Sequence, residues 1–341
     1  MKSYLLQLAE RRSFSEKQMR EAVDSILGEE VSESEIAAFL MGLKSKGETV
    51  DEIVGITKAL KGNTLPFRKK FNGVLDNCGT GGDGSSSFNV STTSAFVLAG
   101  AGIPVAKHGN RSVSSKTGSA DVLEELGVNL NLSPEAIEEM IEEIGIAFLF
   151  APHVHPRLKK VTVVRRALKI PTIFNFIGPL TNPIDLDFQL LGVYRRDLVT
   201  MFAEVLKQLG RKRAVVLNGA GFMDEASLQG ENHLTILDNG VMTSQIITPE
   251  GVNLPQYANS AIKGGDAKEN AQILINVLKG EKGAYRDTVL LNAGIGIFTA
   301  GKADTIEAGI RKAAEIIDSG AAYEKLATLV EKSKGLQREA I

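Results

Sequence analysis

Hydrophobic positions in residues 1–65 recur at the three-to-four-residue spacing of one helical face. The clearest run is formed by Ile36, Phe39, Leu40 and Leu43. Polar pairs at three places have the spacing of a capping box, in which two side chains close the first turn of a helix. These pairs are Ser15 with Gln18, Ser32 with Glu35, and Thr49 with Glu52. The pattern predicts a small bundle of about four short helices.

From residue 71 onward, short apolar runs alternate with helical stretches, which is typical of a mostly parallel sheet flanked by helices. The predicted strands are residues 74–77, 103–106, 146–150, 190–194 and 213–217, the predicted helices are residues 89–98, 120–126 and 133–144 and one ending at residue 210, and residues 234–258 are rich in strand and turn signals. The predicted fold class is therefore α/β. A small N-terminal helical bundle domain (1–65) accompanies a larger α/β domain (71–341).

The segment of about residues 155–185 resembles neither neighbour. Residues 155–168 predict an amphipathic helix, and residues 171–182 form a loop rich in Pro, Gly and Asn. We expect this crossing segment to pack on the helical domain and to line a cleft between the domains. Such junctions commonly hold the ligand site.

Composition and charge exclude several classes of function and structure. The formal net charge of −2 and the pI near 6.2 lack the basic character that nucleic-acid binding requires, so we expect no nucleic-acid partner. The single cysteine, Cys78, excludes an intrachain disulfide. The first residues show no signal-peptide pattern, and the longest apolar run, residues 95–106, is too short to span a membrane. We expect a cytoplasmic protein with no membrane partner.

A glycine-rich loop follows the first predicted strand of the α/β region. Glycines let consecutive backbone N–H groups point one way, and a helix that follows adds its positive end, so the arrangement suits a phosphate. The loop contains Gly79, Thr80, Gly81, Gly82, Asp83 and Gly84, and the next helix opens with Asn89, Ser91 and Thr92. The pattern is neither a Walker motif nor a dinucleotide fingerprint. A purely structural turn is the alternative.

A basic loop, residues 107–111, follows the next predicted strand and would emerge at the same sheet edge. Lys107 and Arg111 suit phosphate oxygens, while His108 and Asn110 could bond a second substrate. The run that follows, residues 112–119, adds hydroxyl groups that end with Ser119. A solvated polar loop is the alternative.

Carboxylates and an arginine complete the candidate chemistry. Asp224 and Glu225 follow the strand at 213–217 and are hard oxygen ligands suited to Mg²⁺, although an acidic helix start has the same pattern. Arg165 lies in the crossing segment with His155 and could clamp a carboxylate, or could pair with acids on a helix surface.

Together these motifs resemble the anthranilate phosphoribosyltransferase family, of the nucleoside-phosphorylase-like class. The resemblance spans nearly the whole chain, with no departure at the motif positions. Its strongest parts are residues 79–84, 89–92, 107–111, 174–183 and 224–225. It implies a glycosyltransferase of tryptophan biosynthesis that moves the phosphoribosyl group of phosphoribosyl pyrophosphate (PRPP) to the amine of anthranilate and releases pyrophosphate.

The resemblance also implies roles for individual residues and a homodimer formed through the helical domain. PRPP would be held by Gly79, Thr80, Gly82, Asp83, Asn89, Ser91, Thr92, Lys107 and Ser119; anthranilate by Asn110, His108, His155, Arg165, Gly178 and Pro179; and two Mg²⁺ ions by Ser91, Asp224 and Glu225. His108 is the candidate catalytic residue. The transferred carbon becomes oxocarbenium-like, so a weak amine suffices as nucleophile and positioning matters more than a strong base.

Two other functions fit parts of the pattern. A pyrimidine-nucleoside phosphorylase shares the architecture but has no need of the acidic pair at 224–225. A non-enzymatic relative that binds nucleic acid would keep the fold, and the acidic pI and the intact acidic pair count against it.

Overall fold

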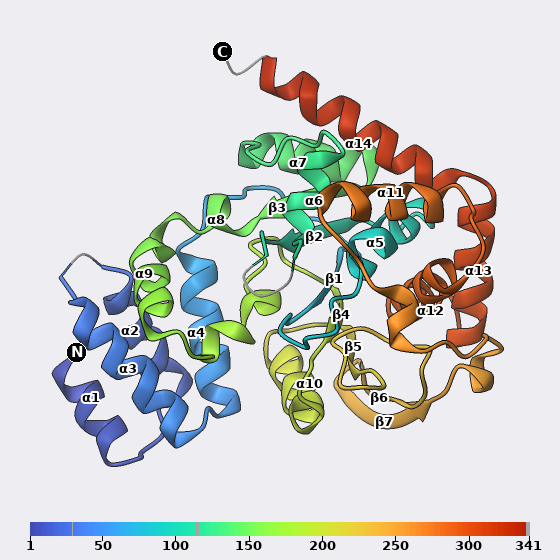
Figure 1. Cartoon of the computed structure of the whole chain (residues 1–341). Coiled ribbons are helices and arrows are strands. Elements are labelled where there is room, and N and C mark those ends of the chain that lie inside the picture. Colours follow the sequence, from blue (N-terminus) through green and yellow to red (C-terminus); the bar gives the residue numbers. More distant parts are fainter. Residues whose placement is uncertain (29, 113–115, 339–341) are drawn as a thin grey trace.

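The computed structural model describes residues 1–28, 30–112 and 116–338, and it places a helical bundle beside a larger sheet domain (Figure 1). Within the described residues the strands form one seven-stranded sheet. The strands are β1 (Leu75–Gly79), β2 (Val105–Gly109), β3 (Ile146–Phe150), β4 (Phe188–Gly192), β5 (Arg213–Asn218), β6 (Asn232–Asp238) and β7 (Val241–Ile247). The helices are α1 (Lys2–Ala9), α2 (Glu16–Ile26), α3 (Glu33–Lys46), α4 (Val50–Gly62), α5 (Val90–Gly100), α6 (Ser119–Glu125), α7 (Pro134–Ile144), α8 (Ala151–Val154), α9 (Lys159–Leu168), α10 (Val199–Gln208), α11 (Ala267–Leu278), α12 (Ala284–Thr299), α13 (Ile306–Asp318) and α14 (Ala321–Arg338).

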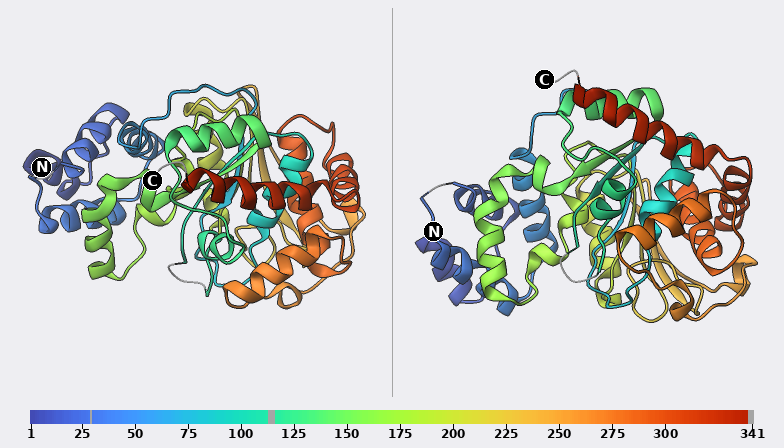
Figure 2. Two further views of the ribbon diagram at one scale, coloured as in Figure 1. Left: turned by 90° about the horizontal axis from the view of Figure 1, so that it is seen from above. Right: turned by 45° about the horizontal axis from the view of Figure 1, so that its top comes forward.

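The bundle begins its helices where the polar pairs predicted. Ser15, Ser32 and Thr49 cap α2, α3 and α4, and each is closed by the expected partner three residues later. Behind the caps, Ile36 and Phe39 are buried in the bundle core. Helix α9 packs against α3, so the crossing segment returns to the bundle as expected, and Figure 2 shows this from two further directions.

The sheet has the order β3-β2-β1-β4-β5-β6-β7. Its first five strands are parallel, and β6 and β7 add to one side as an antiparallel pair. The mostly parallel sheet predicted from the sequence is therefore confirmed. Parallel strands end at a common edge, so the segments that follow β1, β2, β4 and β5 can converge there.

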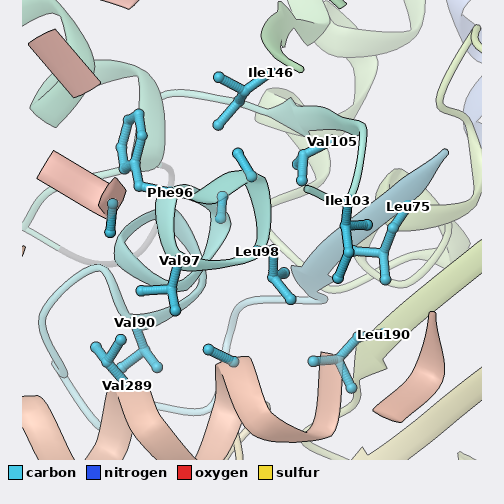
Figure 3. Packing of buried hydrophobic residues seen from close by; sticks show 14 of the residues in the cluster. Leu75, Val90, Phe96, Val97, Leu98, Ile103, Val105, Ile146, Leu190 and Val289 are labelled. Atoms are coloured by element: carbon cyan, nitrogen blue, oxygen red, sulfur yellow. The ribbon is translucent and has the colours of Figure 1, made fainter. Parts of the chain in front are cut away.

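The two faces of the sheet belong to different cores because side chains alternate along a strand. Leu190 and Val215 belong to the core that also contains side chains of α5 and α12, and Figure 3 shows Leu75 and Leu190 in one apolar cluster with Val97 and Leu98 of α5. Their neighbours Leu191 and Val216 face the other way and join the core that includes α10 and the bundle. The bundle is therefore fastened to the sheet by a shared apolar core.

Three sequence-based boundaries need correction. The strands predicted at 74–77 and 103–106 extend to Gly79 and Gly109, because the backbones of their polar ends still pair with β4 and β3. Lys107 and His108 are consequently buried strand residues, where the sequence predicted a loop. The strand predicted at 190–194 is β4, which ends at Gly192.

The helix predicted at 155–168 begins only at Lys159, because the chain has a break at His155. Proline disfavours helical geometry in the residue before it, and Pro156 follows His155 directly. The chain instead forms α8, a single 3-10 turn η1 (Pro156–Leu158) and α9. His155 lies at this break, which turns the chain toward the bundle (Figure 1).

Along the described chain, no helix has both the length and the apolar character needed to span a bilayer.

Candidate active site

The glycine-rich loop leaves β1 at the common sheet edge and leads into α5. Gly81 and Gly82 have φ values of 70° and 81°, in the left-handed region that favours glycine. This geometry turns the backbone so that the N–H of Gly81 donates to Asp224 Oδ2 at 2.6 Å. At the start of α5, the N–H of Ser91 donates to Glu225 Oε1 at 3.1 Å. The structure therefore brings the glycine loop and the acidic pair together, as the sequence predicted.

Two glycines allow this close approach. A Cβ atom on Gly79 or on Gly192, which face each other across β1 and β4, would collide with Asp224. The segment carrying Asp224 and Glu225 thus lies directly over the ends of both strands. The sequence reasoning missed the role of Gly192, although a glycine closing an apolar strand can signal a close backbone approach.

The acidic centre is short of positive charge. Burial raises the pKa of Asp224 well above its usual range, and the nearby carboxylates of Asp83 and Glu225 raise it further. Burial also raises the pKa of Glu225 to about 7, against the opposing effect of Lys107. Lys107 Nζ donates to the carbonyl of Asn77 at 2.6 Å, which holds it beneath the loop. A cation placed among these carboxylates would relieve their repulsion.

The donor set suits Mg²⁺ rather than a metal held wholly by protein. Among the described residues, no group of three or more His, Cys, Asp and Glu side chains is arranged to hold a metal ion. Mg²⁺ is usually bound by one or two carboxylates together with water and substrate phosphate oxygens. Asp224 and Glu225 can supply that protein share.

The remaining predicted PRPP residues differ in whether their polar groups already have partners. Asn89 precedes α5, and its side-chain oxygen accepts from Asn270 Nδ2 at 2.9 Å. Among the described residues, Thr92 Oγ1 and Asp83 Oδ2 are buried polar atoms without a hydrogen-bond partner. Thr80 lies at the start of the loop, where its N–H donates to the carbonyl of Gly192 at 3.0 Å.

Ser119 stands apart from the glycine loop, at the first position of α6. Its hydroxyl donates to the carbonyl of Asn110 at 3.2 Å, which joins the end of β2 to this helix. Arg111 pairs with Asp121 and Glu124 on α6 and is therefore already neutralised.

A second group of predicted residues forms a neutral aromatic cluster, which we propose as one side of a pocket for the acceptor ring. The rings of His108 and His155 meet edge to face, with centroids 5.2 Å apart, and both side chains are buried. Burial lowers the pKa of His108 to about 3 and that of His155 to about 4, so both rings are neutral near pH 7. The Nε2 atom of each ring is buried without a partner within the described chain.

The wall of this pocket is a short 3-10 turn, η3 (Gly178–Leu180), whose carbonyls are held by side chains. The carbonyl of Gly178 accepts two hydrogen bonds, one from His108 Nδ1 at 3.1 Å and one from the Thr181 hydroxyl at 2.9 Å. A Cβ atom on Gly178 would meet no other atom within 4 Å, so this position faces open space. The structure brings His108, His155, Gly178 and Pro179 together.

Buried polar residues that the sequence reasoning missed support the wall. Gln189 Nε2 donates to the carbonyl of Pro179 at 2.6 Å, and Arg211 Nε donates to Gln189 Oε1 at 3.0 Å. Asn182 Nδ2 donates to Asp76 Oδ2 at 3.0 Å, which ties the same loop to β1. A polar side chain inside an apolar strand was the available signal at Gln189, since buried polar groups require partners.

Arg165 and Asn110 are the predicted anthranilate residues that make no direct contact with the histidines. The guanidinium of Arg165 lies 5.4 Å from the ring centre of Phe174 and forms no ion pair with the described residues. Burial lowers its pKa from the usual arginine value. Asn110 is exposed, and its Oδ1 accepts from the N–H of Arg111 at 2.7 Å. A half-buried, unpaired arginine is suited to an incoming anion.

Comparisons with known proteins find relatives over nearly the whole chain. Residues 72–323 match the glycosyl transferase family a/b domain, and residues 2–63 match the helical bundle domain of that family. The chain is 55% identical over 333 residues to a Bacillus cereus protein named anthranilate phosphoribosyltransferase, covering 98% of each. The Thermus thermophilus anthranilate phosphoribosyltransferase structure is similar with a TM-score of 0.92 and 39% identity, covering 97% of this chain and 99% of that one. The Saccharomyces cerevisiae enzyme in complex with PRPP and Mg has a TM-score of 0.90 and 25% identity, covering 98% and 97%.

Proposed function

Because the chain belongs to the glycosyl transferase family that includes the anthranilate phosphoribosyltransferases, we propose that it transfers the phosphoribosyl group of PRPP to anthranilate. The amine nitrogen bonds to the ribosyl carbon, the bond from that carbon to pyrophosphate breaks, and the nitrogen loses a proton. The product is N-(5-phosphoribosyl)anthranilate, an intermediate of tryptophan biosynthesis. The main support in the structure is that the glycine loop and the start of α5 meet the acidic pair Asp224 and Glu225, while His108, in the neighbouring strand, meets His155.

The acidic half is proposed to hold PRPP with two Mg²⁺ ions. Asp224, Glu225 and Ser91 supply the protein ligands, and loop N–H groups bind phosphate oxygens beside them. When bound, Mg²⁺ neutralises the charge that develops on the departing pyrophosphate. Lys107, below the loop, adds positive charge on the protein side.

The neutral half is proposed to hold anthranilate. Arg165 would bind the carboxylate, and the pocket of His108, His155 and Gly178 would receive the ring. His108 donates its Nδ1 proton to the wall, so only Nε2 can accept one. An imidazole with a pKa of about 3 is a weak base, which suits an arylammonium because that group is a strong acid. His108 therefore orients the amine and takes its proton late.

We also propose a cytoplasmic homodimer formed through the helical domain. Exposed large hydrophobic side chains in this region include Leu6 on α1, Val163 on α9 and Ile170 just beyond it. Exposed apolar groups are candidates for burial in an interface. Sedimentation equilibrium tests this, and a Leu6→Glu, Val163→Glu double variant should lower the association constant.

The decisive experiment mixes the purified protein with PRPP, anthranilate and Mg²⁺. We expect loss of anthranilate that requires both PRPP and Mg²⁺. Absence of turnover at high enzyme concentration would contradict the proposal. Phosphorolysis of thymidine or uridine would favour a nucleoside phosphorylase, and salt-sensitive binding of single-stranded DNA without turnover would favour the non-enzymatic alternative.

A further inference from the structure

Tyr194, just beyond the end of β4, contacts both halves of the candidate site. On one side its ring lies against the glycine loop, since a Cβ atom on Gly82 would be 3.6 Å from Cε1 of Tyr194. The backbone N–H of Tyr194 also donates to Thr80 Oγ1 at 3.5 Å. On the other side the ring stacks on Phe176, with centroids 5.5 Å apart and planes inclined by 20°.

Phe176 connects this stack to the wall of the aromatic pocket. It is buried between two short 3-10 turns, η2 (Ile173–Asn175) and η3, and stands two residues before Gly178. Because Gly178 receives the hydrogen bond from His108, a shift of Phe176 would change the position of both the wall and the histidine. Tyr194 itself is only half buried, whereas Phe176 is buried.

We propose that Tyr194 is a positioning residue that couples the two substrate subsites. A pyrophosphate group in the glycine loop fixes the loop against the Tyr194 ring, and the stacked Phe176 then holds the pocket wall in its binding position. Anthranilate consequently binds more tightly when the pyrophosphate subsite is filled, and the effect is reciprocal. This inference rests on the proposed function.

The ring of Tyr194, rather than its hydroxyl group, makes the contacts with the two halves. Within the described residues, the Tyr194 hydroxyl makes no hydrogen bond, whereas the ring provides both the Gly82 and the Phe176 contacts. Tyr194→Phe is therefore the matched control, and Tyr194→Leu removes the stack while keeping apolar bulk. Phe176→Leu removes the same stack from the other side.

The test is calorimetric titration of anthranilate into each protein, with and without magnesium pyrophosphate. For the wild-type protein and Tyr194→Phe, we expect magnesium pyrophosphate to tighten anthranilate binding by about five-fold or more, the lower range of ordinary coupling between sites. For Tyr194→Leu and Phe176→Leu, we expect that ratio to fall toward one. The double variant should lose no more coupling than either single variant, because each single substitution already removes the same Tyr194–Phe176 stack.

Several results would overturn the inference. They are an unchanged anthranilate affinity in the wild-type protein, full coupling in Tyr194→Leu, loss of coupling in Tyr194→Phe, and additive losses in the double variant. Thermal unfolding and circular dichroism of each variant establish that it is folded. If the wild-type protein turns over PRPP and anthranilate but shows no coupling, only this inference fails. If it neither turns over nor binds magnesium pyrophosphate, the proposed function fails as well.

Discussion

The two halves of the candidate site respond to burial in opposite ways. In the acidic half, burial and mutual repulsion raise the pKa values of Asp224 and Glu225, so the centre favours a bound cation. In the aromatic half, burial lowers the pKa values of His108 and His155, so the pocket is neutral. The same desolvation penalises charge in both places. One half is thereby prepared for metal and phosphate, and the other for an aromatic ring.

The halves also differ in how they are held. Backbone groups and closely approaching glycines form most of the acidic half, within one strand–loop–helix unit and one acidic pair. The aromatic half is gathered from β2, the break at His155 and the η3 turn, and a buried relay from Arg211 through Gln189 supports it. Variants can therefore change the groups of one half directly, while the other half is affected only through the Tyr194–Phe176 contact.

The largest effect is expected for Asp224→Asn. Loss of the charge should lower kcat/KM by roughly 10²–10³, the range for removing one electrostatic group from an active site, and raise the Mg²⁺ concentration required. The ligand-free protein should unfold at the same or a higher temperature, because a buried carboxylate with a raised pKa destabilises the fold. Magnesium titrations of activity together with thermal unfolding test this, with Glu231→Gln as the control. Unchanged Mg²⁺ dependence would remove Asp224 from the metal site.

Arg165→Ala should impair the aromatic half selectively. Losing charge-assisted hydrogen bonds to a carboxylate costs about 1.5–3 kcal/mol, or roughly 10- to 150-fold in kcat/KM for anthranilate. PRPP binding should change little because Arg165 contacts Phe174 and no residue of the glycine loop. Steady-state kinetics with each substrate varied provides the measurement. Arg166→Ala, at the exposed neighbouring position, is the control, and equal losses for both substrates would refute this role.

His108→Asn should make the fold less sensitive to acid. The folded-state pKa of His108 is about 3, below its unfolded value near 6.5, so its contribution to stability is complete above pH 6.5 and is lost as pH falls toward 3. Between pH 7 and pH 5, protonation linked to His108 should lower the free energy of unfolding of the wild-type protein by about 2 kcal/mol. The variant should not show this loss. Asparagine keeps a donor for the Gly178 carbonyl. Denaturant unfolding at pH 7 and pH 5 measures the difference, and parallel losses in both proteins would contradict it.

Gly178→Ala is expected to have the smallest effect. The added methyl group would enter open space and compete with the substrate ring, raising KM for anthranilate by roughly five-fold, or about 1 kcal/mol. Stability and KM for PRPP should be unchanged. The opposite result is expected for Gly192→Ala, whose methyl group would collide with Asp224 and disturb the acidic half. Equal losses for the same substrate in both variants would contradict the assignment of the two glycines to different halves.

Local sequence signals were sufficient for the bundle and for the alternation of strands and helices up to β5, but not for the order of the strands in the sheet. The capping boxes at Ser15, Ser32 and Thr49 and the alternation of strands and helices depend on neighbours within a few residues. Strand ends were less predictable. Lys107 and His108 are polar, which favours a loop, yet long-range pairing with β3 and buried partners keep them in β2.

The amino-acid sequence by itself therefore determined the two-domain organisation, the glycine loop with its helix, and the motifs that resemble one enzyme family. Only the tertiary structure decided which side chains share a pocket and which are charged. Gly192 clears space for Asp224, Gln189 donates to the carbonyl of Pro179, and Tyr194 lies near Gly82 and stacks on Phe176. These partners lie from ten to more than a hundred residues apart in the sequence. The desolvation of a group also depends on what the whole fold places around it. The lowered pKa values of the histidines and the raised pKa values of the carboxylates therefore could not be predicted from the neighbouring sequence.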